Sequence, residues 1–260
     1  MRKLKDNLKK VVIKIGSSSI THKNGGVNIE RIEELAKEIV NLYNKGIKVI
    51  LVSSGAIAAG ANRLNLKRPR DTVGKQATAA VGQLSLMNTY LRSFAEYGYM
   101  VGQVLLTKMV ETDKVMYENT TNTINALLDM GVIPIVNEND TISTFEINFG
   151  DNDTLSAVVA KIAGADMLIL LSDIDGLYTD DPRENKEAKM IKEVRQIDDR
   201  LRSMAKDTKN IVGTGGMTTK INAASLCMQE GIDVVIANSK DLKNIRRIMK
   251  GEEIGTIFKG

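Results

Sequence analysis

Short apolar runs rich in β-branched residues alternate with longer segments of helical periodicity, and this alternation restricts the fold more than any other feature. Strands are expected at 11–15, 47–55, 99–107, 132–140, 165–173, 232–238 and 255–259, with a hairpin arm at 141–150. Helices are expected at 28–46, 72–98, 117–131, 153–164, 217–231 and 241–251. Apolar strands separated by helices are typical of a parallel sheet covered on both faces. We therefore predict an α/β protein, a three-layer αβα sandwich with an open, mostly parallel sheet.

Length and composition fit a globular chain with a sizeable core. The chain has 260 residues, of which 43% are apolar and 26% charged, so 1–260 is expected to be a single domain. Cys227 is the only cysteine and is expected to be a small buried apolar residue. A lone cysteine excludes an intramolecular disulfide and is typical of a reducing compartment.

Membrane and nucleic-acid functions are not favoured. The chain has no run of about 18 or more apolar residues, as a spanning helix would need, and its basic start leads into the strand at 11–15 without the apolar segment of a signal peptide. The net charge of +4 is mild and aromatic residues make up only 4%, whereas nucleic-acid binding needs a concentrated basic face. We expect a cytoplasmic protein.

Polar motifs repeatedly follow the predicted strands. "GSSS" follows the first strand, "SSG" ends the second, "NEND" ends with Asp140, and "SD" ends the strand at 165–173. Ligands of open α/β sheets bind at the carboxyl ends of the strands. One composite site at this edge is therefore the simplest interpretation.

Three of these segments suit an anion. Lys14 lies inside a predicted buried strand, where a lysine is costly unless it is paired with an anion, although its amine could also reach solvent at an edge of the sheet. "SSGAIAAG" (53–60) and "GTGGMTTK" (213–220) can direct backbone N–H groups toward a carboxylate or phosphate at a helix start. The alternatives are an ordinary turn at 53–60 and a flexible loop without a ligand at 213–220.

Other segments carry weaker signals. "SDIDGLYTDDPR" (172–183) is compatible with a surface hairpin, and the charge-rich stretch 183–209 is expected to be a solvated connection and helix. His22 is the only histidine and lies outside every motif, so a role as a base is not favoured. Metalloprotease, structural zinc and serine-hydrolase motifs are missing from the sequence.

Taken in order, the motifs resemble the amino acid kinase family. "VIKIGSSSIT", "VSSGAIAAG", "IPIVNEND", "FGDNDTLSA", "LLSDIDGLYTDDPR" and "GTGGMTTK" carry the resemblance from residue 12 to residue 220. "GDNDTLSA" is the most specific of them, and it is most similar to members that act on glutamate. The resemblance implies an amino-acid-binding lobe at about 1–170 and a nucleotide-binding lobe at about 171–260.

The resemblance also implies roles for individual residues. Catalytic roles fall to Lys14, Lys220 and Asp153, with Asp153 organising the two lysines. Substrate binding falls to Ser54, Gly55, Asp140 and Asn152. Nucleotide binding falls to Lys14, Ser172, Asp173, Thr214, Gly215, Gly216, Met217, Thr218, Thr219 and Lys220. Ser172 stands where the commoner family form has threonine, and the hydroxyl is retained. No residue is assigned to a metal, because Mg²⁺ is expected to be carried by ATP.

The implied reaction is ATP-dependent phosphorylation of the side-chain carboxylate of L-glutamate to L-glutamyl 5-phosphate, the first step of proline biosynthesis. Proline is expected to inhibit, the chain to form a homo-oligomer, and the glutamyl phosphate reductase to be functionally coupled. The chain is expected to be the form without the additional C-terminal domain that many bacterial members carry. The alternatives are another member of the family, acting on aspartate, acetylglutamate or a small phosphorylated substrate, and a nucleotide-binding regulator without catalysis.

Overall fold

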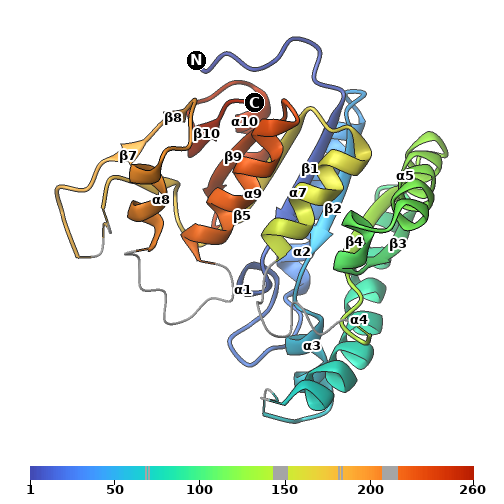
Figure 1. Ribbon diagram of the computed structural model, residues 1–260. Coiled ribbons are helices and arrows are strands. Elements are labelled where there is room, and N and C mark those ends of the chain that lie inside the picture. Colours follow the sequence, from blue (N-terminus) through green and yellow to red (C-terminus); the bar gives the residue numbers. More distant parts are fainter. Residues whose placement is uncertain (68, 70, 143–151, 181, 183, 207–215) are drawn as a thin grey trace.

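A computed structural model describes residues 1–67, 69, 71–142, 152–180, 182, 184–206 and 216–260. Its centre is an eight-stranded sheet with the order β3-β4-β2-β1-β5-β9-β10-β8 (Figure 1). The strands are β1 (Lys10–Ile15), β2 (Lys48–Ser53), β3 (Val101–Leu106), β4 (Ile133–Glu138), β5 (Met167–Ser172), β8 (Glu193–Val194), β9 (Asp233–Asn238) and β10 (Thr256–Phe258). Every neighbouring pair is parallel except β9 and β10, which confirms the mostly parallel sheet that the sequence predicts.

Helices cover both faces of the sheet, as in a three-layer sandwich. One face packs against α5 (Lys114–Asp129), α7 (Asn152–Ala163) and α9 (Met217–Gln229), of which α7 and α9 lie in front in Figure 1. The other face packs against α2 (Ile29–Tyr43), α4 (Thr72–Ala95) and α10 (Asn244–Met249). Alternate residues of β1 belong to opposite core clusters, because successive strand side chains point to opposite faces.

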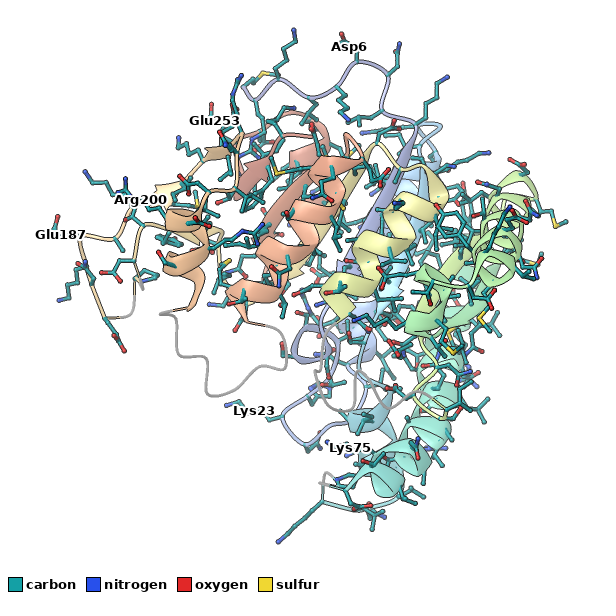
Figure 2. The ribbon with its side chains drawn as sticks, in the orientation of Figure 1. Asp6, Lys23, Lys75, Glu187, Arg200 and Glu253 are labelled. Carbon is teal, nitrogen blue, oxygen red and sulfur yellow. The ribbon has the colours of Figure 1, made fainter. Side chains whose placement is uncertain are left out.

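The smaller elements lie around this frame. They are α1 (Ser17–Ile20), α3 (Ala56–Arg63), the 3₁₀ helix η1 (Lys108–Glu111), α8 (Asp199–Lys206), and the ribbon of β6 (Leu177–Tyr178) and β7 (Met190–Ile191). The ribbon and α8 project at one side of the molecule, where Glu187 and Arg200 mark the outer surface in Figure 2. Lys23 and Lys75 mark the lower edge, close to α3 and the start of α4.

The register of the central strands brings their carboxyl ends together. Ile15 of β1 is level with Ser53 of β2 on one side and with Leu171 of β5 on the other. Ser172 is level with Asn238 of β9. The polar residues that follow these strands therefore leave the sheet at the same edge, which is the arrangement that the sequence predicts.

Most predicted elements are confirmed, with differences at the ends. The "GSSS" motif after β1 contributes to the single turn α1, which was not among the predicted helices, and the predicted strand at 99–107 begins only at Val101. The stretch 183–209 holds α8 as expected, but it also supplies β8, an edge strand of the sheet that the charge-rich sequence did not indicate. The predicted hairpin arm lies outside the described residues from 143 onward. None of the helices that are described is long and apolar enough to cross a membrane.

Candidate active site

Asp153 lies at the centre of a buried group of charged side chains. Its Oδ1 is 2.6 Å from Nζ of Lys14, and its Oδ2 is 3.0 Å from Nζ of Lys220. Thr219 donates a hydrogen bond of 2.9 Å to the same Oδ2. Lys14 comes from β1, Asp153 from the first turn of α7 and Lys220 from the first turn of α9. Three elements that are distant in sequence thus meet at the carboxyl end of the sheet.

The electrostatics of this group favour an anionic ligand. Asp153 is fully buried, and Lys14 and Lys220 are only 7% and 5% exposed. Burial alone would raise the pKa of Asp153, but the two ammonium groups outweigh it and hold this pKa well below its usual range. One ionised carboxylate between two lysines leaves these three groups with a net charge of +1. Two ammonium groups at the same place attract an anionic ligand, such as a phosphate.

Two helix starts border the lysines. Gly216 caps α9 and Gly16 caps α1, and neither cap involves a side chain. A side chain added at Gly16 would lie 3.9 Å from Nζ of Lys14, so the backbone runs close to that ammonium. First-turn N–H groups of a helix such as α9 point outward along its axis and favour negative charge.

Asn152 joins the ends of β2 and β4. Its amide nitrogen donates to the carbonyl of Ser53 at 2.9 Å, to Oγ of Ser54 at 2.7 Å and to Oδ1 of Asn137 at 3.0 Å. Its amide oxygen is buried and has no hydrogen-bond partner among the residues that the structure describes. Gly55, which follows Ser54, has a φ of 106° and caps α3, a left-handed conformation that favours glycine.

Asp140 lies just after β4, beyond Glu138, and both carboxylates are buried. Burial, and then the charge of Glu138, raises the pKa of Asp140 to about 7. A carboxylate held at this cost gains when a cation approaches it, so the site suits an ammonium group.

The end of β5 lies beside the loop that follows β9. Ser172 donates from its hydroxyl to Oδ1 of Asp173 at 3.1 Å, and its carbonyl accepts from the N–H of Ser239 at 2.6 Å. The hydroxyl of Ser19, in α1, donates to Oγ of Ser239 at 2.7 Å. Ser239 therefore links α1 to β5, the strand that carries Ser172.

The structure gathers most of the predicted site residues at one edge of the sheet. Direct contacts join Lys14, Asp153, Thr219 and Lys220 in one group, and Ser54 and Asn152 in another. Met217 is buried at the start of α9, whereas Thr218 and Asp173 are exposed. Thr214 and Gly215 lie outside the described residues. Gln83 and Tyr90, which contact the ends of β4 and β2, were not predicted, because nothing distinguishes them within the amphipathic pattern of α4.

A mostly parallel α/β sheet whose carboxyl edge holds two buried lysines around one aspartate is suited to a phosphotransferase. The chain belongs to the amino acid kinase family, whose model matches residues 9–238.

Curated relatives cover nearly the whole chain. It is 51% identical to the glutamate 5-kinase of Clostridium acetobutylicum, over 97% of this chain and 95% of that protein. It is 48% identical to the glutamate 5-kinase of Clostridium perfringens, over 99% of this chain and 98% of the relative. The glutamate 5-kinase of Carboxydothermus hydrogenoformans is 50% identical over 99% of this chain, which spans 70% of that longer protein.

Solved structures confirm the fold. The UMP kinase of Bacillus anthracis matches with a TM-score of 0.65 and 19% identity, over 97% of this chain and 96% of that one. An isopentenyl phosphate kinase also matches with a TM-score of 0.65, at 18% identity, over 96% of this chain and 100% of that one. At this level of identity the likeness concerns the architecture alone.

Proposed function

We propose that this chain transfers the γ-phosphoryl group of ATP to the side-chain carboxylate of L-glutamate, giving ADP and L-glutamyl 5-phosphate in proline biosynthesis. The observation that carries the proposal is the buried contact of Asp153 with both Lys14 and Lys220. The relatives at about 50% identity, which are curated as glutamate 5-kinases, support the choice of substrate.

The chemistry needs positioning and charge neutralisation more than proton transfer. A carboxylate nucleophile is already ionised at neutral pH, so no general base is required. Its attack brings two anions together, and Lys14 and Lys220 would reduce their repulsion and meet the charge of the transferring group. Asp153 holds both ammonium groups in fixed positions, so they need not reorganise during transfer.

ATP and glutamate would occupy neighbouring parts of the same edge. Lys14, Ser172 and the start of α9 are assigned to the nucleotide, with Mg²⁺ entering on the ATP phosphates and neutralising part of their charge. Asp140 and the amide oxygen of Asn152 are assigned to the substrate ammonium. The backbone around Ser54 and Gly55 is assigned to the carboxylate that reacts.

An assay of ADP release with a panel of acceptors tests the proposal. L-Glutamate should be preferred over L-aspartate, because a site with fixed ends misplaces a carboxylate that is one methylene shorter. One methylene is worth about 10- to 200-fold in kcat/KM. N-acetyl-L-glutamate should react poorly because it lacks the ammonium that Asp140 would bind. Faster turnover with either competitor at equal concentration would reject glutamate as the substrate.

Regulation and assembly belong to the same proposal. Proline carries the α-carboxylate and amine that the glutamate end of the site would bind, so it should inhibit competitively with glutamate.

The chain should form a homo-oligomer through α4. The product, L-glutamyl 5-phosphate, is unstable, which favours functional coupling to the glutamyl phosphate reductase. A cytoplasmic location agrees with Cys227, which is a buried free thiol.

A further inference from the structure

We propose that Gln83 is a positioning residue, which acts through Asn137 to fix the direction in which the Asn152 carboxamide faces the amino acid substrate. Gln83 belongs to α4 and Asn137 to β4. Oε1 of Gln83 accepts a hydrogen bond of 2.8 Å from Nδ2 of Asn137. The inference rests on the proposed function, since it concerns how the same site recognises glutamate.

Two backbone groups determine which way each carboxamide is turned. The N–H of Glu138 can only donate, and it donates to Asn137 at 2.9 Å, so the oxygen of Asn137 must face it. The nitrogen of Asn137 must then face Gln83, which has to present its oxygen. At the other end the carbonyl of Ser53 can only accept, so the nitrogen of Asn152 must face it. Both ends require the same arrangement, and it leaves the oxygen of Asn152 for another donor.

That oxygen is the unsatisfied member of the network. Asn152 is only 4% exposed, and its Oδ1 has no partner within the described part of the chain. An unpaired buried acceptor is unfavourable, so a donor supplied by the substrate gains more there than at an exposed acceptor. An α-ammonium group offers three donors, and Asp140 supplies a carboxylate at the same end of the sheet. The pair would distinguish an amino acid from a dicarboxylate that has no ammonium group.

Gln83 matters because Asn137 cannot hold its orientation equally well alone. Without an acceptor at position 83, Nδ2 of Asn137 loses its hydrogen-bond partner in a nearly buried position. The N–H of Glu138 and the carbonyl of Ser53 still favour the same orientation of both carboxamides. Asn137 is then held by one contact fewer, so its Oδ1 holds the amide nitrogen of Asn152 less firmly. The oxygen of Asn152 would then be less well fixed at the place where the ammonium binds.

The experiment compares L-glutamate with glutarate, which keeps both carboxylates and lacks the ammonium. Gln83→Met removes the acceptor with little change in volume, and Gln83→Glu retains an accepting oxygen. Asn122→Ala removes an exposed carboxamide from α5 and serves as the control. Kinetic constants are measured for both acceptors, and where glutarate reacts too slowly its inhibition constant against glutamate replaces them.

Gln83→Met should lower kcat/KM for glutamate about 5- to 50-fold, the range of one lost buried hydrogen bond, chiefly through KM. Its constant for glutarate should stay within about twofold of the wild-type value, and Gln83→Glu should keep most of the wild-type preference for glutamate. Equal losses for both acceptors, or an unchanged ratio, would overturn the role of Gln83. A wild-type enzyme that does not phosphorylate glutamate would instead reject the proposed function.

Discussion

At the scale of single residues, the proposed roles separate groups that would meet the transferring phosphoryl group from groups that would hold the amino acid. Lys14 and Lys220 converge on Asp153 at one place, while Asn152 and Asp140 lie at the ends of β2 and β4. Asn152 and Asp153 are adjacent in sequence, yet Asp153 contacts the two lysines and Asn152 contacts Ser53 at the end of β2. On the proposed roles, the first turn of α7 therefore joins substrate binding to catalysis.

The kinetics of single substitutions should show this separation. Lys14→Ala and Lys220→Ala should fall mainly on kcat, by about 10²–10³-fold, because both lysines would meet charge that develops during transfer. Asp153→Asn should also lower kcat strongly and change the KM for glutamate little. Asp140→Ala should instead raise that KM far more than it lowers kcat, because an ammonium contact is present before and during transfer. Steady-state constants for the four variants, with circular dichroism to check folding, decide the matter. The roles would be reversed if Asp140→Ala lowered only kcat and Asp153→Asn raised only the KM for glutamate.

Asp140 should also make glutamate binding depend on pH. Its pKa is raised to about 7, first by burial and then by Glu138, so the free enzyme carries a protonated Asp140 at pH 6 and an ionised one at pH 8. The ammonium needs the ionised form, so the KM for glutamate should fall as pH rises from 6 to 8. Asp140→Asn should remove most of this change, whereas Asp173→Asn should keep it. A KM that is flat with pH in the wild type would contradict the assignment.

The raised pKa of Asp140 affects stability in the opposite direction: the rise in pH that favours glutamate binding lowers the free energy of unfolding. A carboxyl whose folded pKa is raised binds more protons in the folded state, so Asp140 lowers the free energy of unfolding as pH rises from about 4 to about 7. Asp153, whose pKa is depressed, stabilises the fold above the unfolded pKa of about 3.9, and that contribution is lost in acid as pH falls toward its depressed pKa. Between about pH 4 and pH 7, ionisation of Asp140 therefore lowers the stability of the fold while it creates a group that can bind a cation.

At the scale of elements, the contact between α3 and α4 depends on two glycines. A Cβ added at Gly60 would lie 1.7 Å from the carbonyl oxygen of Thr78, and one added at Gly82 would lie 1.8 Å from that of Ala56. The two backbones therefore approach more closely than any side chain allows. This contact fixes α3, which begins beside Ser54 and Gly55, against α4, which carries Gln83 and Tyr90.

Gly82→Ala should accordingly destabilise the protein. Helix propensity alone predicts a gain of about 0.5–1 kcal/mol, since glycine inside a helix is unfavourable relative to alanine. The clash with the backbone of Ala56 should exceed this gain, and overpacking of this kind costs about 1–3 kcal/mol. Unfolding in urea measures the change in the free energy of unfolding, and a decrease is expected. A more stable Gly82→Ala protein would mean that α3 and α4 can move apart freely.

The difference between local patterns and long-range contacts explains how much of the fold and the site the sequence could predict. The strand and helix pattern predicted the layers, and the polar strand ends predicted one composite site, because both are local signals. The roles of Lys14, Asp153 and Lys220 in that site came from the family resemblance. The edge strand β8 was missed because Glu193 and Val194 gain their strand conformation from pairing with β10, not from their own pattern. Gln83 was missed because its role depends on a contact with Asn137, 54 positions away.

At the scale of the whole molecule, one sheet joins the two proposed lobes. β1 and β5 pair along their length, so the boundary near residue 170 falls within a continuous hydrogen-bonded frame. Contacts beside the site reinforce it, because Arg31 of α2 donates to the carbonyls of Ser239 and Lys240, and Ser19 donates to Ser239. These bonds would hold α1 and α2 against the loop after β9, beside the proposed nucleotide site, while substrates enter.

Association through α4 is the remaining expectation at this scale. Val73, Val81, Leu84 and Leu91 are exposed, and at 100° per residue they fall within an arc of about 80° on the helix. Gln83 and Tyr90 lie well outside that arc and contact β4 and β2, so one side of α4 supports the site while the other presents an apolar stripe. Stripes of this kind in a folded protein commonly mark an interface.

Leu84→Glu should therefore convert a homo-oligomer into smaller species. Leu84 is 76% exposed, and a charge at the centre of a buried interface would lose its hydration without gaining a partner. Met130→Glu is the matched control, because Met130 is 75% exposed at the end of α5, away from the stripe. Size-exclusion chromatography with light scattering at micromolar concentration should show an oligomer for the wild type and Met130→Glu, and a smaller mass for Leu84→Glu. A monomeric wild type would reject association, and an unchanged Leu84→Glu oligomer would move the interface away from α4. Since Gln83 adjoins Leu84 in the same helix turn, a dissociated Leu84→Glu protein with a raised KM for glutamate would further indicate that assembly supports the substrate end of the site.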